Sequence, residues 1–328
     1  MQITSHTFKA NTVKALADVE LQRALGHVEK GFIDKRQTAV DALPEFDALR
    51  DNAVAIKNHT LKHLDLYIEA YVAKVEASGG IVHFAEDADH ARKIFLDIAR
   101  KRNAKTVTKG KTMISEEIGL NAFLEENGIV PVETDLGEYI IQLRGEHPSH
   151  IIAPAVHVTR DQVEADFRRV HVDLDPNRNL VEPETLLGEA RQILRRKYAE
   201  ADIGVTGANF LIAETGSSVI VTNEGNRDLT QLLGKCHVVL ASIEKLVPTL
   251  EDTAQILRIL ARSATGQDMS VYTTLSTGPK READLDGPEE YHVILLDNGR
   301  SNMLGTEFKE MLRCIRCGAC MNHCPVYH

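Results

Sequence analysis

The stretch GIVHFAEDADHARKIFLDIARKRNAKTVT, residues 80–108, decides the fold class. It begins with an apolar strand over 81–84 and ends with a second strand over 105–108, and the residues between them, 87–102, carry apolar side chains at helical spacing. A strand, a helix and a strand joined by short connections form a right-handed crossover between parallel strands. The stretch therefore predicts an α/β domain with a largely parallel sheet and helices on both faces.

The same alternation continues along the chain. Further helices are predicted over 115–126, 183–201 and 249–263, and further strands near 128–132, 203–206, 218–222 and 237–241. Two late strands, 269–275 and 292–296, are expected to close the sheet, and a helix over 302–312 follows them. The chain thus divides into a helical region (1–78), an α/β domain (79–301) and a linker helix with a cysteine segment (302–328).

The cysteine segment reads CIRCGACMNHCP over residues 314–325. Cys314, Cys317, Cys320 and Cys324, followed by Pro325, have the spacing by which bacterial ferredoxins hold a 4Fe-4S cluster. A structural zinc site is the alternative, but zinc ligands usually form two pairs separated by a dozen or more residues. The spacing therefore predicts that these cysteines are metal-binding residues that hold an iron-sulfur cluster. Such a cluster indicates a role in electron transport. Cys236, alone in an apolar run, is expected to be a buried hydrophobic residue.

Composition and charge exclude several classes of protein. The chain has 328 residues with 43% hydrophobic and 26% charged side chains, which is globular material, and its formal net charge of −10 argues against nucleic acid as a partner. No stretch approaches the roughly 18 apolar residues of a membrane span, so direct membrane insertion is not expected. Because there is neither a secretory signal nor a disulfide pattern, the sequence predicts a cytoplasmic protein.

Polar side chains follow two groups of predicted strands. Lys109, Lys111 and Ser115 come after the strand at 105–108 and are a plausible seat for a carboxylate or phosphate at a helix start. The alternative is that Ser115 only caps a helix whose first turn is acidic.

The second group of polar side chains is expected to face the first across one cleft, because ligands bind outside the carboxyl ends of parallel strands. Its members are Asn209, Glu214, Thr215, Asn223 and Glu224. Turn chemistry alone could explain the run over 223–226.

Several motifs together resemble the lactate utilisation protein B family. They are KGKTMISEE (109–117), GANFLIAETGS (207–217), NEGN (223–226), DGPEE (286–290) and LDNGRS (296–301), ahead of the cysteine segment. The resemblance runs from about residue 58 to residue 327. It implies a LUD domain, similar to the sugar-isomerase and CoA-transferase α/β group, joined to a two-cluster ferredoxin-like module. It also implies a cytoplasmic three-protein complex that oxidises L-lactate to pyruvate, in which this subunit carries electrons and is not a complete oxidoreductase alone.

The chain departs from this family at its end, where only one cysteine set is present before His328. Family members continue into a second set, so we expect a truncated chain holding the first half of the module. In two-cluster ferredoxins the fourth cysteine of one set serves the other cluster. The resemblance therefore implies that Cys314, Cys317 and Cys320 hold one cluster, while Cys324 serves a second whose other ligands are absent.

Two other interpretations remain open. In the first, the LUD cleft is an enzyme active site for acyl or sugar-phosphate chemistry, with Glu214 as nucleophile or base and a regulatory or structural cysteine tail. In the second, the chain is an assembly scaffold whose tail is stabilised by zinc. Under the leading interpretation no catalytic residue is assigned, because a cluster takes no hydride from lactate and the two-electron chemistry must lie in a flavin, another cofactor or another subunit.

Overall fold

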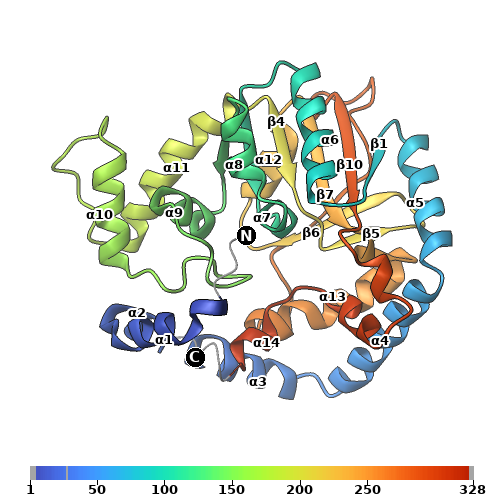
Figure 1. The fold of residues 1–328 in the computed structure, drawn as a ribbon, viewed down its shortest axis with the longest axis horizontal. Coiled ribbons are helices and arrows are strands. Elements are labelled where there is room, and N and C mark those ends of the chain that lie inside the picture. Colours follow the sequence, from blue (N-terminus) through green and yellow to red (C-terminus); the bar gives the residue numbers. More distant parts are fainter. Residues whose placement is uncertain (1–4, 27–28, 325–328) are drawn as a thin grey trace.

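The computed structural model describes residues 5–26 and 29–324. Its centre is a six-stranded sheet in the order β1-β10-β7-β4-β2-β3, and every pair of neighbours is parallel. In that order the strands are Ile81–Ala85, Glu290–Leu296, Cys236–Ser242, Ile203–Thr206, Thr106–Gly110 and Val130–Glu133. The prediction of an α/β domain with a parallel sheet is confirmed (Figure 1).

Helices cover both faces of this sheet because the buried strands are apolar on both sides. On one face, α6 (Ala88–Lys101) and α8 (Leu120–Glu126) pack against Val238 and Leu240 of β7. On the other face, α5 (Leu64–Ala77) packs against Val239 and Ala241 of the same strand. Successive side chains of β7 therefore point alternately into two separate cores, one on each face of the sheet.

Helix α12 (Asn226–Leu233) lies directly against β4, beside α11 (Pro183–Ala199). The contact is made possible by Gly204, where a Cβ atom would stand 1.8 Å from the carbonyl oxygen of Thr230. Glycine lets the helix and strand backbones approach this closely. This contact fixes the start of α12 at the carboxyl edge of the sheet.

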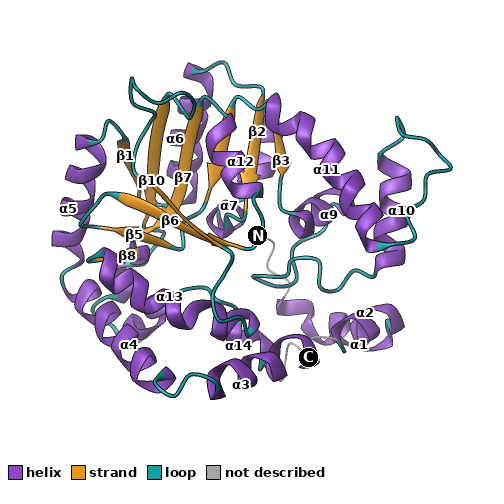
Figure 2. Cartoon of the chain, turned by 180° about the vertical axis from the view of Figure 1, so that it is seen from behind, coloured by secondary structure: helices purple, strands orange, loops and turns teal. Residues whose placement is uncertain are grey.

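A second sheet of four strands lies beside the first, as Figure 2 shows. Its order is β8 (Leu246–Val247), β5 (Phe210–Ile212), β6 (Ser217–Thr222) and β9 (Tyr272–Ser276). Helices α13 (Leu250–Thr265) and α4 (Phe46–Lys62) pack on it and share its core. The expectation that the two late strands close one sheet is wrong, because β9 pairs with β6 here and β10 lies inside the first sheet between β1 and β7.

The described part of residues 1–78 is helical, as predicted. It comprises the 3-10 turn η1 (Ser5–Thr7), α1 (Phe8–Ala17), α2 (Val19–Leu25), the π-helical turn η2 (Glu29–Ile33), α3 (Asp34–Asp41), α4 and α5. Tyr71 and Val75 of α5, and Phe46 and Ile56 of α4, are buried in the cores beneath the two sheets. The helical region is thus continuous in packing with the α/β part.

Helices α9 (Leu136–Arg144) and α10 (Arg160–Val170), which the sequence analysis did not identify, pack with α11 around a further core. Two predicted helices differ from the structure. The helix predicted over 115–126 is divided into α7 (Met113–Glu117) and α8 because Gly119 adopts a left-handed conformation, φ 63°. The helix predicted over 302–312 consists of two 3-10 segments, η4 (Ser301–Met303) and η5 (Glu307–Arg313), separated by Gly305, a residue that disfavours a continuous helix.

Candidate functional site

The cysteine segment docks against the carboxyl edge of the parallel sheet. Ile315 and Cys317 pack on the core of the second sheet, and the guanidinium of Arg316 lies 3.2 Å from Glu117 and 3.7 Å from Glu244. Glu117 belongs to α7, which follows β2, and Glu244 belongs to η3 (Ile243–Lys245), which follows β7. The segment is therefore held where the strands of the sheet end.

The short helix α14 (Ala319–Asn322) anchors the far end of the segment. Asn322 is buried, and its Oδ1 accepts a hydrogen bond from His150 Nε2 at 2.9 Å. Its Nδ2 donates to the carbonyl oxygen of Ala264 in α13 at 3.3 Å. In Figure 1 this helix lies beside α13 at the bottom of the molecule. Pro325, the last residue of the cysteine motif, lies outside the described residues.

The backbone between the cysteines turns sharply at two positions. Arg316 (φ 57°) and Gly318 (φ 77°) both adopt left-handed conformations, and the backbone N–H of Arg316 donates to Cys314 Sγ at 3.4 Å. Burial raises the pKa of Cys317, and the neighbouring thiols of Cys314 and Cys320 raise it further. These three thiols therefore lie close enough to interact, and Cys314 and Cys320 are exposed.

Two buried lysines lie near Cys314. Burial lowers the pKa of Lys57, in α4, to about 8 and that of Lys245 to about 7, while Glu244 and Cys314 act to raise both. The ammonium of Lys57 donates to the carbonyl oxygens of Glu244 and Leu246. Positive charge at this depth would offset the negative charge of a cysteine-bound metal group.

A network of carboxylates and guanidinium groups joins the segment to the sheet. Arg300, which follows β10, contacts Glu117 at 2.8 Å and Glu244 at 2.9 Å. Burial acts to raise the pKa of Glu117, but hydrogen bonds from Arg300 and Asn298, with the charge of Arg316, outweigh it and hold this pKa at about 2. Glu117 is therefore ionised over the physiological range and holds both arginines.

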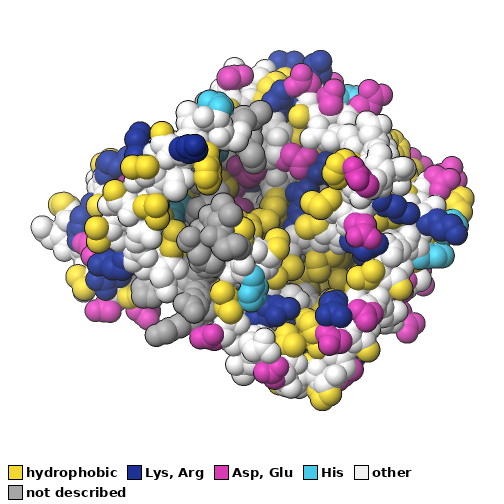
Figure 3. Space-filling view, turned by 60° about the horizontal axis from the view of Figure 1, so that its bottom comes forward, with side chains coloured by type: hydrophobic (Ala, Val, Ile, Leu, Met, Phe, Trp, Pro, Cys, Tyr) yellow, Lys and Arg dark blue, Asp and Glu magenta, His cyan; other side chains and the backbone are white. Residues whose placement is uncertain are grey.

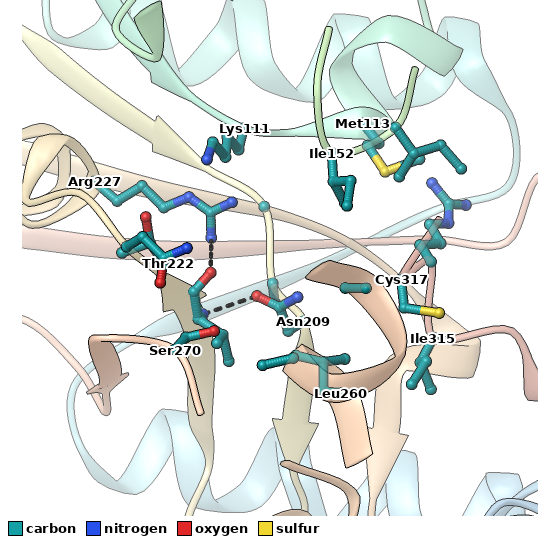
Figure 4. Close-up of a pocket in the computed structure, with 18 of the residues that line it drawn as sticks. Lys111, Met113, Ile152, Asn209, Thr222, Arg227, Leu260, Ser270, Ile315 and Cys317 are labelled. Carbon is teal, nitrogen blue, oxygen red and sulfur yellow. Dashed lines mark hydrogen bonds between the residues drawn. The ribbon is translucent and has the colours of Figure 1, made fainter. Parts of the chain in front are cut away.

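A cavity of about 160 Å³ lies between the sheet edge and the cysteine segment. This is far more than the roughly 10–15 Å³ that one water molecule needs. The basic side chains that line it are Lys111, Arg227, Lys245 and Arg316. Its polar lining includes Asn209 and Asn223. Its apolar wall includes Met113, Ile152 and Leu260. Figure 4 shows Arg227 and Lys111 on one side of the cavity and Met113, Cys317 and Ile315 on the other. In Figure 3 the corresponding face is hollowed, with Lys and Arg side chains beside hydrophobic ones.

The structure brings half of the predicted cleft residues together. Lys111, Asn209 and Asn223 line the cavity, and Glu224 is joined to it through an ion pair with Lys111 of 3.1 Å. Lys111 also pairs with Asp135 at 2.9 Å. Asn209 accepts a hydrogen bond from the backbone N–H of Val221, so it fixes the second sheet beside the cavity. Whether any of these residues binds a ligand stays a prediction.

The other four predicted residues lie elsewhere. Lys109 is fully buried and pairs with Glu133 at 2.6 Å. Ser115 is buried in the first turn of α7, whose cap is Thr112, so the alternative that Ser115 caps the helix is wrong. Glu214 accepts a hydrogen bond from the backbone N–H of Leu250 and shares a separate surface depression with Thr215. The second sheet carries these two residues away from the cavity, so Lys109 and Glu214 do not face each other across one cleft.

The sequence analysis missed Arg227, Lys245 and Glu138, which all line the cavity. Lys245 could have been found, because it closely follows a strand, 236–242, that is buried throughout and therefore lies at the ligand-binding edge. Arg227 follows the NEGN turn within a helix and carries no local signal of burial. Its position depends on the contact of α12 with β4.

Cys236 is buried, as predicted, and lies at the opposite edge of the sheet. Among residues 5–26 and 29–324, the ligand atoms of Cys236, Glu290 and His292 form a group within 4.8 Å of one another. Burial, together with the charge of Glu290, raises the pKa of Cys236 to about 12. Arg102 lies 3.5 Å from Glu290, and its charge opposes a cation there. This group therefore lacks the electrostatics of a metal site.

Within the described residues, no helix combines the length and apolar character needed to cross a bilayer.

A family model described as the LUD domain matches residues 68–296. Lactate utilization protein B of Bacillus subtilis (strain 168) is 42% identical over 328 residues, which cover 100% of this chain and 68% of that protein. The uncharacterized electron transport protein YkgF of Escherichia coli (strain K12) is 41% identical over 325 residues, which cover 99% of this chain and 68% of that protein.

Among solved structures, the crystal structure of a DUF162 family protein from Deinococcus radiodurans aligns with a TM-score of 0.36 and 14% sequence identity. The alignment covers 71% of this chain and 98% of that one.

Proposed function

Because this chain belongs to the LUD domain family, with lactate utilization protein B among its relatives, we propose that it carries electrons in lactate utilization through a 4Fe-4S cluster held by its cysteine segment. The name of the relative YkgF, an electron transport protein, supports the same role. The observation that carries the proposal is the docking of the cysteine segment at the sheet edge, with Lys57 and Lys245 near Cys314.

The residues of the segment fit such a cluster. The donor set consists of thiols only, which suits iron and sulfur, and the N–H of Arg316 already donates to Cys314 Sγ. Hydrogen bonds to the sulfurs and nearby charge are the levers by which a protein sets cluster potential. Buried Lys57 and Lys245, with Arg316 at the segment itself, supply positive charge on the protein side.

Cys314, Cys317 and Cys320 would hold the first cluster, and Cys324 would serve a second cluster in a longer chain. The cluster, when bound, accepts and donates one electron at a time. Cys314 and Cys320 are exposed, so this side of the segment is open to an electron-transfer partner. Cys317, half-buried against the core of the second sheet, fixes the segment to the domain.

The partners we propose are the other subunits of a cytoplasmic complex that oxidises L-lactate to pyruvate. Lactate oxidation removes two electrons, whereas the cluster carries one, so the two-electron step belongs to a flavin or another cofactor outside this cysteine segment. The role of this chain is then to pass electrons onward one by one.

Metal analysis after anaerobic reconstitution tests the proposal. The chain should bind iron and acid-labile sulfide, and the reduced protein should give an electron paramagnetic resonance signal. Cys317→Ser should lose iron, sulfide and signal, because it removes the central ligand of the segment. Cys236→Ala is the matched control, since Cys236 lies at the other edge of the sheet, and should keep all three. Stoichiometric zinc without sulfide would contradict the proposal.

A further inference from the structure

Arg227 is a buried cation that lacks a contacting anion. It is 7% exposed, its Nη1 donates to the carbonyl oxygen of Val221 at 3.3 Å, and its Nε has no hydrogen-bond partner. Within the part of the chain that the structure describes, no carboxylate lies within 4.0 Å of its guanidinium. Removing a charged group from water without pairing it is unfavourable, so a buried arginine in this state indicates a missing anionic partner.

The nearby carboxylates do not supply that partner. Asp135 and Glu224 both contact the ammonium of Lys111, at 2.9 and 3.1 Å. Burial, with repulsion from Glu133 and Asp135, raises the pKa of Glu138 to about 8, so Glu138 is mostly protonated at neutral pH. Asp228 accepts hydrogen bonds from Gln231 and Thr274 instead. These groups moderate the field at Arg227 from a distance without contacting it.

Lys245, whose pKa burial lowers to about 7, brings a second basic group to the same cavity. It is 5% exposed, and no carboxylate of the described residues lies within 4.0 Å of its ammonium. Arg316, which also lines the cavity, is paired with Glu117. The cavity therefore contains one permanent cation, Arg227, whose charge is not matched at contact distance, and a second basic group, Lys245, beside it. Its wall on the side of Met113, Ile152 and Leu260 is apolar.

We propose that this cavity binds a small organic carboxylate, whose carboxylate group is held by Arg227 and whose carbon part packs on Met113, Ile152 and Leu260. A planar guanidinium matches a carboxylate through two parallel hydrogen bonds. Because Ile315 and Cys317 form the opposite wall, the bound anion lies against the cysteine segment. The proposal goes beyond electron transfer and does not depend on a cluster being present.

Calorimetric titration of the full chain with pyruvate, L-lactate and inorganic phosphate tests the proposal. Arg227→Met should weaken pyruvate or L-lactate binding at least tenfold. Arg227→Lys, which keeps the charge but loses the two parallel N–H donors of the guanidinium, should weaken binding less. Arg258→Met, at an exposed arginine of α13 paired with Glu45, is the matched control and should leave binding unchanged. Phosphate separates the two kinds of anion: binding of phosphate alone, with neither carboxylate bound, would overturn the proposal.

Thermal unfolding provides a second readout that a purely structural arginine would not give. Without ligand, the Tm of Arg227→Met should equal or exceed that of the parent chain, because the variant removes an unpaired buried charge. Pyruvate should raise the Tm of the parent chain and not that of the variant. A variant with lowered Tm and unchanged pyruvate affinity would show that Arg227 is structural and would overturn the proposal. Iron content, measured on the same preparations, reports on the cluster separately.

Discussion

At the scale of single residues, the site is defined by where charge is buried. Lys109, Lys57 and Arg227 are all nearly inaccessible to water, but their surroundings differ. Lys109 has a carboxylate partner at 2.6 Å, Lys57 donates to carbonyl oxygens, and Arg227 has one carbonyl contact. The three cations therefore have three different roles.

Lys57→Met should lower the reduction potential of the reconstituted cluster. The positive charge near Cys314 stabilises the reduced, more negative state, and a charge interaction of about 1–2 kcal/mol corresponds to roughly 40–90 mV for one electron. A redox titration followed by electron paramagnetic resonance measures the shift. Lys197→Met, at an exposed lysine in the last turn of α11, is the control. Equal potentials in both variants would mean that Lys57 does not act on the cluster.

Lys109→Met should destabilise the chain by about 3–5 kcal/mol, because it leaves Glu133 buried without its partner. Pyruvate affinity of the folded variant should not change, since Lys109 does not line the cavity. Urea unfolding and calorimetry check the two parts. A stable Lys109→Met protein that no longer binds pyruvate would restore the anion role expected from the sequence.

Glu117→Gln should destabilise the chain by roughly 2 kcal/mol at pH 7. The folded pKa, about 2, lies below the ordinary value of 4.5, so the ionised carboxylate stabilises the fold fully above pH 4.5. This contribution is lost as the pH falls from 4.5 towards 2. Unfolding of the cluster-free protein by urea should therefore give a parent-to-variant difference that is large at pH 7 and shrinks at pH 3. A constant difference over this range would contradict the assignment.

At the scale of elements, the contact of α12 with β4 positions the cavity. Gly204→Ala would place a Cβ atom 1.8 Å from the Thr230 carbonyl oxygen, so the helix must shift. We expect a loss of stability of about 3 kcal/mol or more and weaker pyruvate binding, because Arg227 begins the same helix. Thermal unfolding and calorimetry measure both effects. Gly188→Ala, at an open position of α11, is the control and should be tolerated.

The helices and strands also show which parts of the fold can be predicted from the sequence. The strand at 203–206 and the helix start at Pro183 are predicted correctly because their signals are local. Strands β5 and β8 have three and two residues, too few to show a period, and the central place of β10 depends on pairing across the chain. The cysteines proposed as cluster ligands are also chosen from local spacing, and their role stays a prediction. Arg227 and Lys245 meet only in the folded protein, so no sequence pattern reveals their cavity.

At the scale of the whole molecule, distant parts of the chain converge near Cys314. Lys57 comes from the helical region and Lys245 from the segment that follows β7. The cysteine segment follows both of them in the sequence. The surface that would hold the cluster is thus formed by the complete fold. It also leaves Cys314 and Cys320 exposed on one side.

The isolated, reconstituted chain should not oxidise L-lactate. A one-electron cluster has no means of accepting a hydride, so the reaction requires a further cofactor. Anaerobic reduction of a redox dye by L-lactate should therefore be absent, whereas the dithionite-reduced chain should reduce the dye, which shows that the cluster is competent. Lactate-dependent dye reduction by this chain alone would contradict the assigned role.

The central place of β10 has a consequence for synthesis. Its neighbours β1 and β7 cannot pair with it until residues 290–296 have been made, and β1 ends at residue 85. At roughly 5–20 residues per second, the ribosome needs on the order of 10–40 s to cover that interval. Throughout this interval β1 has no neighbouring strand, and β7, once residues 236–242 have been made, has an open apolar edge until β10 follows. The nascent chain therefore cannot complete its central sheet until residues 290–296 have been made, and the cysteine segment, which lies after them, can dock only then.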